Sequence, residues 1–315
     1  MTVRFLIFCA LCAFGTASQA GPYAPAAGRA GSTAIAKNST LIKGWATGYS
    51  NYAPGTNVDA TWRNPAKGLG VAQGTSFDIV ALGDAGRITL SFNGSIFNGS
   101  GWDFAVFENG FNDSFLEFAF VEVSSNGTSF FRFPSFSFTP GAVSAFGAVD
   151  PTNVDGLAGK YRQGFGTPFD LDLFRGIAGL DVNHITQVRL VDVVGNGSER
   201  DNWPTSVGGP HRIYDPYRTS GSGGFDLDAL GVRYLNATAA APARVSVTNF
   251  GSGLSRSVPT ATVRGALVAD ATTVFVAAPG SVPLPPSACL LLVPLAALVR
   301  RMRRVTDVRE PAALV

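Results

Sequence analysis

Several acidic residues of this chain lie in or beside strongly apolar segments. Asp103 and Glu108 flank Phe-Ala-Val-Phe, Asp192 follows Leu-Val, and Asp226 and Asp228 alternate with Phe and Leu. Burying a carboxylate in such a segment is costly unless the group is paired or bound to a metal ion. Ca²⁺ suits these groups because it takes about six to eight oxygen ligands. The pattern therefore predicts a Ca²⁺ cofactor, with Asp103, Glu108, Asp192, Asp226 and Asp228 as its ligands.

Two other interpretations of the same carboxylates stay open. They could form ion pairs with Arg132, Arg189 or Arg233, or they could point to solvent from the outer sides of strands. Asp170 and Asp172 form a further pair, which we expect on one face of a strand that follows residues 164–168.

Aromatic residues suggest a second kind of site. Trp203, Tyr214 and Tyr217 lie in residues 195–224, a long stretch rich in Gly and Pro. Loops of that length are unusual in compact domains and are often functional. The three rings could stack on sugar rings, although Trp and Tyr also serve as ordinary packing residues.

Other routes to catalysis have little support. His184 and His211 are the two histidines of the chain, so a zinc enzyme would need a rare ligand set. The body of the chain contains no Gly-x-Ser-x-Gly nucleophile motif. A carboxylate pair such as Glu108 with Glu122 could serve a polysaccharide-active enzyme, which remains the least favoured alternative. We therefore expect a protein that is not an enzyme.

The elements that must position these residues are predicted to be strands. The chain has 24 Phe and 2 Met, with many Val, Ile and Thr and frequent Gly and Asn-Gly turn signals. The 83–86 turn and Asn126-Gly127 predict hairpins. Strands are expected over residues 77–82, 87–92, 102–108, 115–124, 129–133, 184–194 and 225–234. Strands with short turns predict an all-β fold, an antiparallel β-sandwich or jelly-roll-like domain over residues 41–235. Within it, residues 104–107 are apolar on both faces, which predicts a central strand buried on both sides.

Charge and cysteine content exclude some classes of function. The chain has 24 Lys and Arg against 22 Asp and Glu, but six of the basic residues lie in the two ends. The middle of the chain is thus slightly acidic, and we expect no nucleic-acid partner. Its three cysteines, Cys9, Cys12 and Cys289, lie in apolar segments near the ends, so the exported part has no disulfide.

Both ends of the chain have the composition of export signals. A basic start, an apolar stretch and Ser18-Gln19-Ala20 predict a signal peptide over residues 1–20, removed by signal peptidase. We expect a flexible lead over 21–40 and a hairpin, linker or stalk over 236–281. A proline-rich motif then precedes the apolar run 288–299, which is short for a transmembrane helix, and an arginine cluster. Residues 305–315 form the expected cytoplasmic tail.

This carboxyl-terminal arrangement, over residues 282–304, resembles the PEP-CTERM sorting signal of Gram-negative bacteria that make exopolysaccharide. Leu284 stands where that motif usually has Glu, and eleven residues follow the arginine cluster. The resemblance implies recognition by an exosortase, a transient anchor in the inner membrane, and release to the cell surface or extracellular matrix. Its sorting residues here are Val282, Pro283, Leu284, Pro285, Arg300 and Arg301.

The body of the chain carries a second resemblance, over about residues 44–234. Its segments Asp-Phe-Ala-Val-Phe-Glu-Asn-Gly-Phe, Phe-Val-Glu-Val-Ser-Ser-Asn-Gly, Gly-Phe-Gly-Thr-Pro-Phe-Asp-Leu and Gly-Gly-Phe-Asp-Leu-Asp-Ala resemble a family of uncharacterised bacterial cell-surface proteins. That resemblance implies a secreted β-domain without assigned catalytic residues. We therefore expect a surface protein with a binding or structural role beside exopolysaccharide; the alternative is a Ca²⁺-assisted carbohydrate-binding module.

Overall fold

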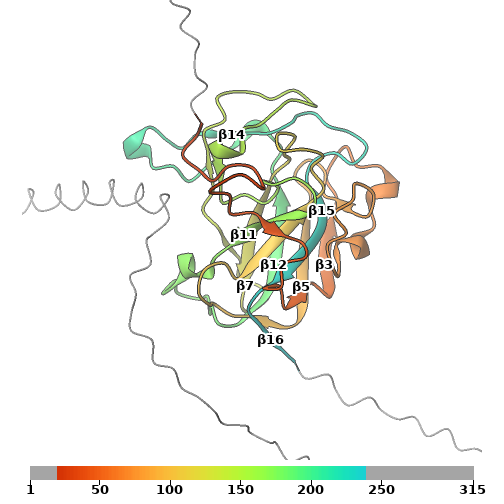
Figure 1. The fold of residues 1–315 in the computed structure, drawn as a ribbon, viewed down its shortest axis with the longest axis vertical. Helices are drawn as coiled ribbons and strands as arrows, with labels where there is room; N and C mark the ends of the chain where they lie inside the picture. Colours follow the sequence, from red (N-terminus) through yellow and green to blue (C-terminus); the bar gives the residue numbers. More distant parts are fainter. Residues whose placement is uncertain (1–19, 239–315) are drawn as a thin grey trace, which may run out of the picture. The chain divides into compact units, whose positions relative to one another are not determined.

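The computed structural model describes residues 20–238 (Figure 1). The predicted signal peptide, stalk, sorting motif and tail lie outside these residues, apart from Ala20 and residues 236–238. No helix among the described residues is both long enough and apolar enough to cross a membrane. The fold is all-β, as predicted, and every pairing between its named strands is antiparallel.

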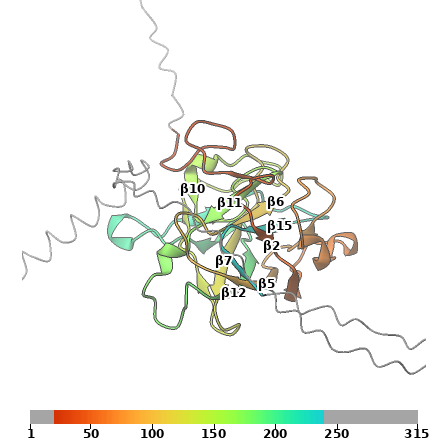
Figure 2. The same ribbon diagram turned by 60° about the horizontal axis from the view of Figure 1, so that its bottom comes forward.

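Two six-stranded sheets form the body of the domain. The first sheet has the order β1 (Ile35–Ala36), β11 (Phe165–Phe169), β6 (Phe104–Glu108), β15 (Asp226–Val232) and β2 (Gly44–Trp45), with β4 (Val80–Ala81) paired to β15. The second has the order β16 (Leu235–Ala237), β5 (Arg87–Ile96), β12 (Ile185–Asp192), β7 (Ala119–Ser124) and β8 (Phe131–Arg132), with β3 (Gly48–Ala53) paired to β5. Figure 2 shows β6, β15 and β2 of the first sheet together with β7, β12 and β5 of the second.

Short elements connect the two sheets. The remaining strands form two small ribbons, β9 (Phe136–Ser137) with β10 (Val154–Asp155) and β13 (Asn196–Arg200) with β14 (Arg212–Tyr214). The 3₁₀ helices are η1 (Ala60–Trp62), η2 (Pro65–Gly68), η3 (Pro151–Asn153), η4 (Leu171–Phe174) and η5 (Thr205–Val207).

Both sheets contribute side chains to one apolar core. The second sheet supplies alternate residues, such as Leu90 of β5 and Leu190 of β12, and the first supplies Phe104 and Leu230. This period of two follows from the pleat, which points successive side chains to opposite faces. The two faces of each sheet can therefore be compared directly.

The first sheet is covered on both faces, whereas part of the second is not. In β6 every residue is buried: Phe104 and Val106 lie in the main core, and Ala105 and Phe107 pack in a second cluster with Ala229. This confirms the prediction of a central strand buried on both sides. In β12 the residues between the core positions are only partly buried, so this strand keeps one face towards solvent.

The structure corrects the hairpin predicted at residues 83–86. Its two flanking strands belong to different sheets, because β4 pairs with β15 while β5 pairs with β3, β12 and β16. The turn therefore carries the chain from one sheet to the other. The hairpin predicted at Asn126-Gly127 is confirmed, since β7 pairs with β8.

Two further predictions differ from the structure. Residues 21–40, expected as a flexible lead, pack on the domain, since Ala27 is buried and β1 pairs with β11. Asp170 and Asp172 do not share a strand face: the carboxylate of Asp170 caps η4 by accepting the N–H of Asp172, and Asp172 itself is exposed.

A backbone contact beside β7 gives a test of the packing. Gly159 has φ +88°, and a Cβ added there would lie 1.9 Å from the carbonyl oxygen of Glu117. Gly176 has a similar φ of +77° with open space around it. We expect Gly159→Ala to lower the free energy of unfolding by about 2–5 kcal/mol, and Gly176→Ala, which adds only backbone strain, by about 1–2 kcal/mol. Urea unfolding of both variants measures the difference; equal losses would contradict this packing.

Candidate functional site

Three of the five predicted calcium ligands are bonded to loop backbone. Asp103 accepts the N–H groups of Gly99 and Leu171, both at 2.7 Å. Asp192 accepts those of Phe225 at 2.7 Å and Ala85 at 3.0 Å. Each carboxylate thereby fastens two segments that are distant in the sequence.

Asp228 acts in the same way on a more distant loop. Its two oxygens accept the N–H groups of Gln73 at 2.9 Å and Gly74 at 2.8 Å. Arg132 and Arg189 form no ion pair with any predicted ligand, because both bind Glu122. The alternative of ion pairing with these arginines is therefore wrong for Asp103, Asp192 and Asp228, which brace loops instead.

The sequence analysis missed two carboxylates of the same kind. Asp201 accepts the N–H groups of Trp203, His211 and Ser137 at 2.7–3.1 Å, and Asp215 accepts that of Phe118 at 2.9 Å. Both are buried. Asp201 lies between Arg200 and Asn202, and Asp215 is followed by Pro216. Neither lies in a continuous apolar run of the kind that singled out Asp192.

Burial and hydrogen bonding shift the pKa values of these carboxylates in opposite directions. Burial raises the pKa of Asp103 to about 6 and the pKa of Asp192 and Asp215 well above the ordinary value. The N–H donors oppose this rise because they favour the charged form. Burying each of these carboxyl groups thus costs free energy, and the hydrogen bonds that it accepts from loop N–H groups offset part of that cost.

The other two predicted ligands, Glu108 and Asp226, do come together. They join Glu117, and the three are 1%, 2% and 4% exposed, respectively. We call Glu108, Glu117 and Asp226 the carboxylate trio. Glu108 Oε2 accepts the N–H of Gly110 at 2.6 Å, and Glu117 Oε1 accepts the hydroxyl of Thr219 at 2.7 Å.

Two oxygens of the trio have no hydrogen-bond partner among the described residues. These are Glu108 Oε1 and Asp226 Oδ1. Asp226 Oδ2 accepts a long 3.3 Å bond from Asn109, and the nearby Ser222 hydroxyl acts to lower the pKa of Asp226. Burial raises the pKa of Asp226 to about 8 and those of Glu108 and Glu117 well above their usual range, and repulsion from Asp226 adds to both glutamate shifts. The trio therefore favours protonated forms at neutral pH unless a cation enters.

The geometry does not assemble the predicted calcium site. Within residues 20–238, no three His, Cys, Asp or Glu side chains lie where they could together hold one metal ion. Glu108 and Asp226 are the two predicted ligands with oxygens left free. A cation at this place would need further oxygens from backbone or water.

The predicted sugar-binding aromatic residues do not form one platform. Trp203 packs against Phe136, Phe138 and His211, with ring centroids 5.0–6.0 Å apart. No ring pair within the described part of the chain joins it to Tyr214 or Tyr217. Trp203 is half-buried in a small aromatic cluster beside β9, which favours the packing interpretation.

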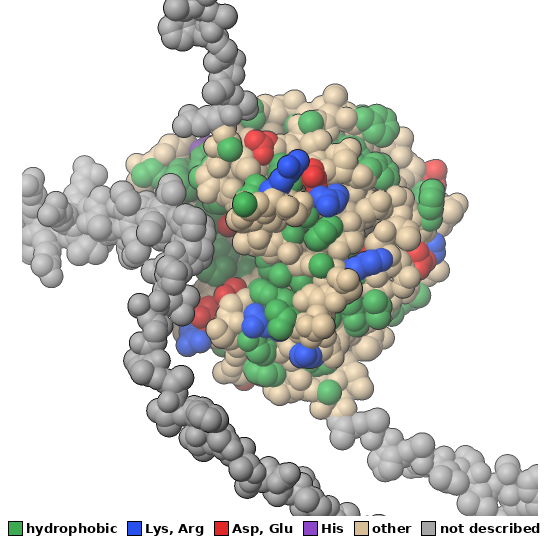
Figure 3. Space-filling view, in the orientation of Figure 1, with side chains coloured by type: hydrophobic (Ala, Val, Ile, Leu, Met, Phe, Trp, Pro, Cys, Tyr) green, Lys and Arg blue, Asp and Glu red, His purple; other side chains and the backbone are tan. Residues whose placement is uncertain are grey.

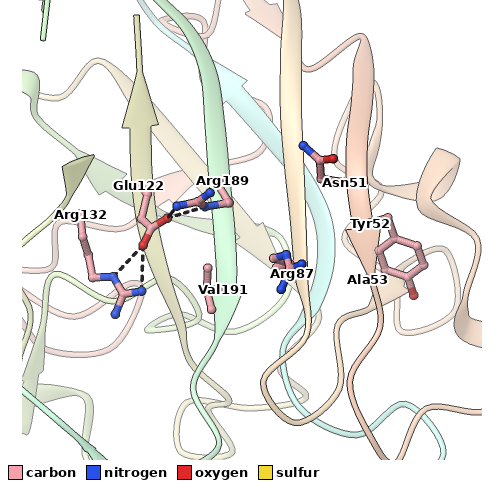
Figure 4. Close-up of a pocket in the computed structure, with 8 residues that line it drawn as sticks. All are labelled: Asn51, Tyr52, Ala53, Arg87, Glu122, Arg132, Arg189 and Val191. Atoms are coloured by element: carbon pink, nitrogen blue, oxygen red, sulfur yellow. Dashed lines mark hydrogen bonds and ion pairs between the residues drawn. The ribbon is translucent and has the colours of Figure 1, made fainter. Parts of the chain in front are cut away.

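A pocket that the sequence analysis missed lies on the second sheet. It has a volume of about 700 Å³ and is lined by Asn51, Tyr52, Ala53, Arg87, Glu122, Arg132, Arg189 and Val191 (Figure 4). Strand register explains the grouping, because Glu122 lies opposite both Arg132 and Arg189, and Arg87 lies opposite Val191. Cross-strand partners share a face, so these four charged side chains project from the side of the sheet opposite the main core, whereas Tyr52 at the edge of the pocket packs against that core.

Glu122 and two arginines form an ordered row across this pocket. Both nitrogens on one edge of Arg132 bind Glu122 Oε1 at 2.8 Å, and Arg189 binds Oε2 in the same way. Figure 4 shows the carboxylate between the two guanidinium groups. The structure does not bring Glu122 together with Glu108, the pair considered for a polysaccharide-active enzyme, because Glu122 lines this pocket on the second sheet and Glu108 is buried in β6 of the first.

Comparison with known proteins gives no further guide to the site. No protein-family model, no curated protein and no solved structure matches this chain. The likeness of the carboxyl-terminal segment and of the body to known families therefore stays a prediction from the sequence.

The carboxylate trio predicts a particular dependence of stability on pH. Burial raises the folded pKa of Asp226 to about 8, so between about pH 4 and pH 8 this group keeps a proton in the folded protein that the unfolded chain has lost, and the raised pKa values of Glu108 and Glu117 act in the same direction. In the presence of a chelator, the free energy of unfolding should therefore fall as pH rises through this window. Each retained proton contributes a slope of up to about 1.4 kcal/mol per pH unit.

Two variants test whether this slope comes from the carboxylate trio. Asp226→Asn should make it shallower, because one titrating group is removed, while Asp59→Asn, at an exposed aspartate, should leave it unchanged. Denaturant unfolding from pH 4 to 9 measures both. A stability that increases across the window in the parent protein would contradict the protonated trio.

Proposed function

We propose that this chain is an exported, surface-sorted β-sandwich or jelly-roll-like protein that binds or organises exopolysaccharide and is not an enzyme. The observation that carries the proposal is the open, arginine-lined pocket on the second sheet. A sheet that is packed on one face and polar on the other offers a stable surface for an extended ligand. Signal peptidase and an exosortase would process the ends, with the carboxyl-terminal segment as a membrane anchor before cleavage.

The distribution of charge supports an extracellular binding role over nucleic-acid binding. On the face shown in Figure 3, basic and acidic side chains are interspersed and form no continuous basic surface. Nucleic-acid binding by the phosphate backbone requires such a surface. The arginines of the pocket are a local feature of a mixed surface, which suits a discrete ligand group.

The account of export and binding is tested in the native host. Antibodies against residues 41–235 should detect a shortened protein at the cell surface or in the matrix, and the purified protein should sediment with isolated exopolysaccharide. Intact chain retained in the cytosol would overturn export. Release of new reducing ends from the polymer, with no lasting binding, would show the enzymatic alternative instead.

A second candidate function is a Ca²⁺-assisted carbohydrate-binding module. The observation that favours it is the pair of buried oxygens without partners, Glu108 Oε1 and Asp226 Oδ1. A hard cation would satisfy both and would relieve the repulsion within the trio. It would also have to displace the protons that burial retains.

This second candidate predicts stabilisation by calcium that depends on pH. Millimolar Ca²⁺ should raise the Tm at pH 8, where protons compete weakly, and have little effect at pH 5. Asp226→Asn should abolish the shift and Asp59→Asn should retain it. Thermal unfolding with Ca²⁺ or chelator measures this, and an unchanged Tm at pH 8 would leave the trio as a metal-free element of the fold.

A further inference from the structure

The charge of the pocket on the second sheet is unbalanced. Its lining contains three arginines and one glutamate. Both oxygens of Glu122 are already occupied by Arg132 and Arg189. Arg87 forms no ion pair or hydrogen bond through its side chain with the described residues, although it faces the same pocket. The site therefore has an excess of positive charge and free N–H donors.

The two paired arginines are held in place before any ligand binds. The guanidinium of Arg132 lies 4.2 Å from the ring centre of Phe120, and that of Arg189 lies 3.9 Å from that of Phe130. Each arginine binds Glu122 through one edge of its planar guanidinium group, which leaves the remaining N–H groups available. Holding donors in this way lowers the entropy lost on binding.

The arginines of the pocket are accessible from solvent. The side chains of Arg132 and Arg189 are 44% and 31% exposed, whereas Glu122 is 7% exposed. Hence a ligand meets the arginines first and the glutamate hardly at all. The volume of about 700 Å³ lies within the range of small-molecule sites.

An irregularity in β3 adds neutral polar groups at the edge of the pocket. The register with β5 shifts between Ser50 and Ala53, and Asn51 has φ +50°. Such bulges redirect side chains near binding sites. Figure 4 shows Asn51 on the side of the pocket opposite Arg132, with Arg87 and Arg189 between them. An amide in that position can bind a hydroxyl beside the charged group.

We propose that this pocket binds an anionic sugar residue, through its carboxylate, within an acidic polysaccharide. This rests on the proposed role beside exopolysaccharide and names the class of that ligand. The unpaired guanidinium group of Arg87 binds the carboxylate of the sugar. Arg189 on β12 and Arg132 on β8 add positive charge, and Asn51 contacts a ring hydroxyl. Arginine forks match carboxylates in geometry as well as in charge.

The test compares two oligosaccharides that differ only in charge. Isothermal titration calorimetry is run on the purified full chain with a galacturonate hexamer and with its carboxyl-reduced counterpart. We expect binding of the hexamer that weakens with added salt, and at least about tenfold weaker binding of the reduced form. Equal binding of both forms would overturn the proposal.

Variants place the binding at this pocket. Arg87→Ala should weaken binding of the hexamer at least about tenfold, and Arg87→Lys less, because it keeps the charge but loses the fork. Arg29→Ala, at an exposed arginine outside the pocket, is the matched control and should change binding less than about twofold. Arg87 is exposed, so its replacement should leave the thermal unfolding curve in place, which excludes misfolding.

The remaining outcomes separate this inference from the proposed function. If native exopolysaccharide binds but Arg87→Ala binds it equally well, the pocket is wrong and the broader role stands. If neither the hexamer nor the native polymer binds, both fail. If single-stranded DNA binds as tightly and with the same dependence on Arg87, the ligand class is wrong and a nucleic acid takes its place.

Discussion

Buried carboxylates that accept backbone N–H groups are the interaction on which this fold depends. Asp103, Asp192 and Asp228 each join a strand, or the start of one, to loops far away in the sequence. In a buried site such bonds are costly to leave unmade, because the carboxyl group and the loop N–H groups would then lose water without gaining a partner. They let irregular connections lie against the sheets in a domain whose body contains no cysteine.

The same constraint explains why the chain has three different kinds of acidic site. Where loop N–H groups reach a carboxylate, as at Asp192, burial is partly compensated. Burial raises the pKa in both kinds of site, but in the trio Glu108 and Asp226 also keep oxygens without partners, so either a proton or a cation is needed there. Glu122 is the third case: it lies on the outer face and is balanced by two arginines. Only this last arrangement leaves charge directed at solvent, which is why the binding role is placed there.

The sequence predicts those features that depend on local periodicity. The all-β class and the doubly buried strand β6 follow from alternation and from apolar residues on both faces. The 83–86 hairpin was wrong because the partner of β4 is β15, about 145 residues away, and no local signal encodes that choice.

The site was less predictable for a related reason. Asp228 looks like a metal ligand in the sequence because its neighbours are apolar, yet its partners are N–H groups 154 and 155 residues distant. The pocket could be found only in part: Arg189 alternates with core positions on β12, as Glu122 does on β7. That they lie opposite each other depends on strand register, which alternation alone does not fix.

The protonation state of the buried carboxylates tests the central claim most directly. Carbon-13 NMR of the side-chain carboxyl groups, assigned with Glu108→Gln, Glu117→Gln and Asp226→Asn, follows each group through a pH titration. The account predicts that Asp226, whose pKa burial raises to about 8, stays protonated at pH 6 in chelator, and that Glu108 and Glu117 also titrate above their usual range because of burial. Ionisation of all three trio groups by pH 5, in a folded protein without bound metal, would contradict it.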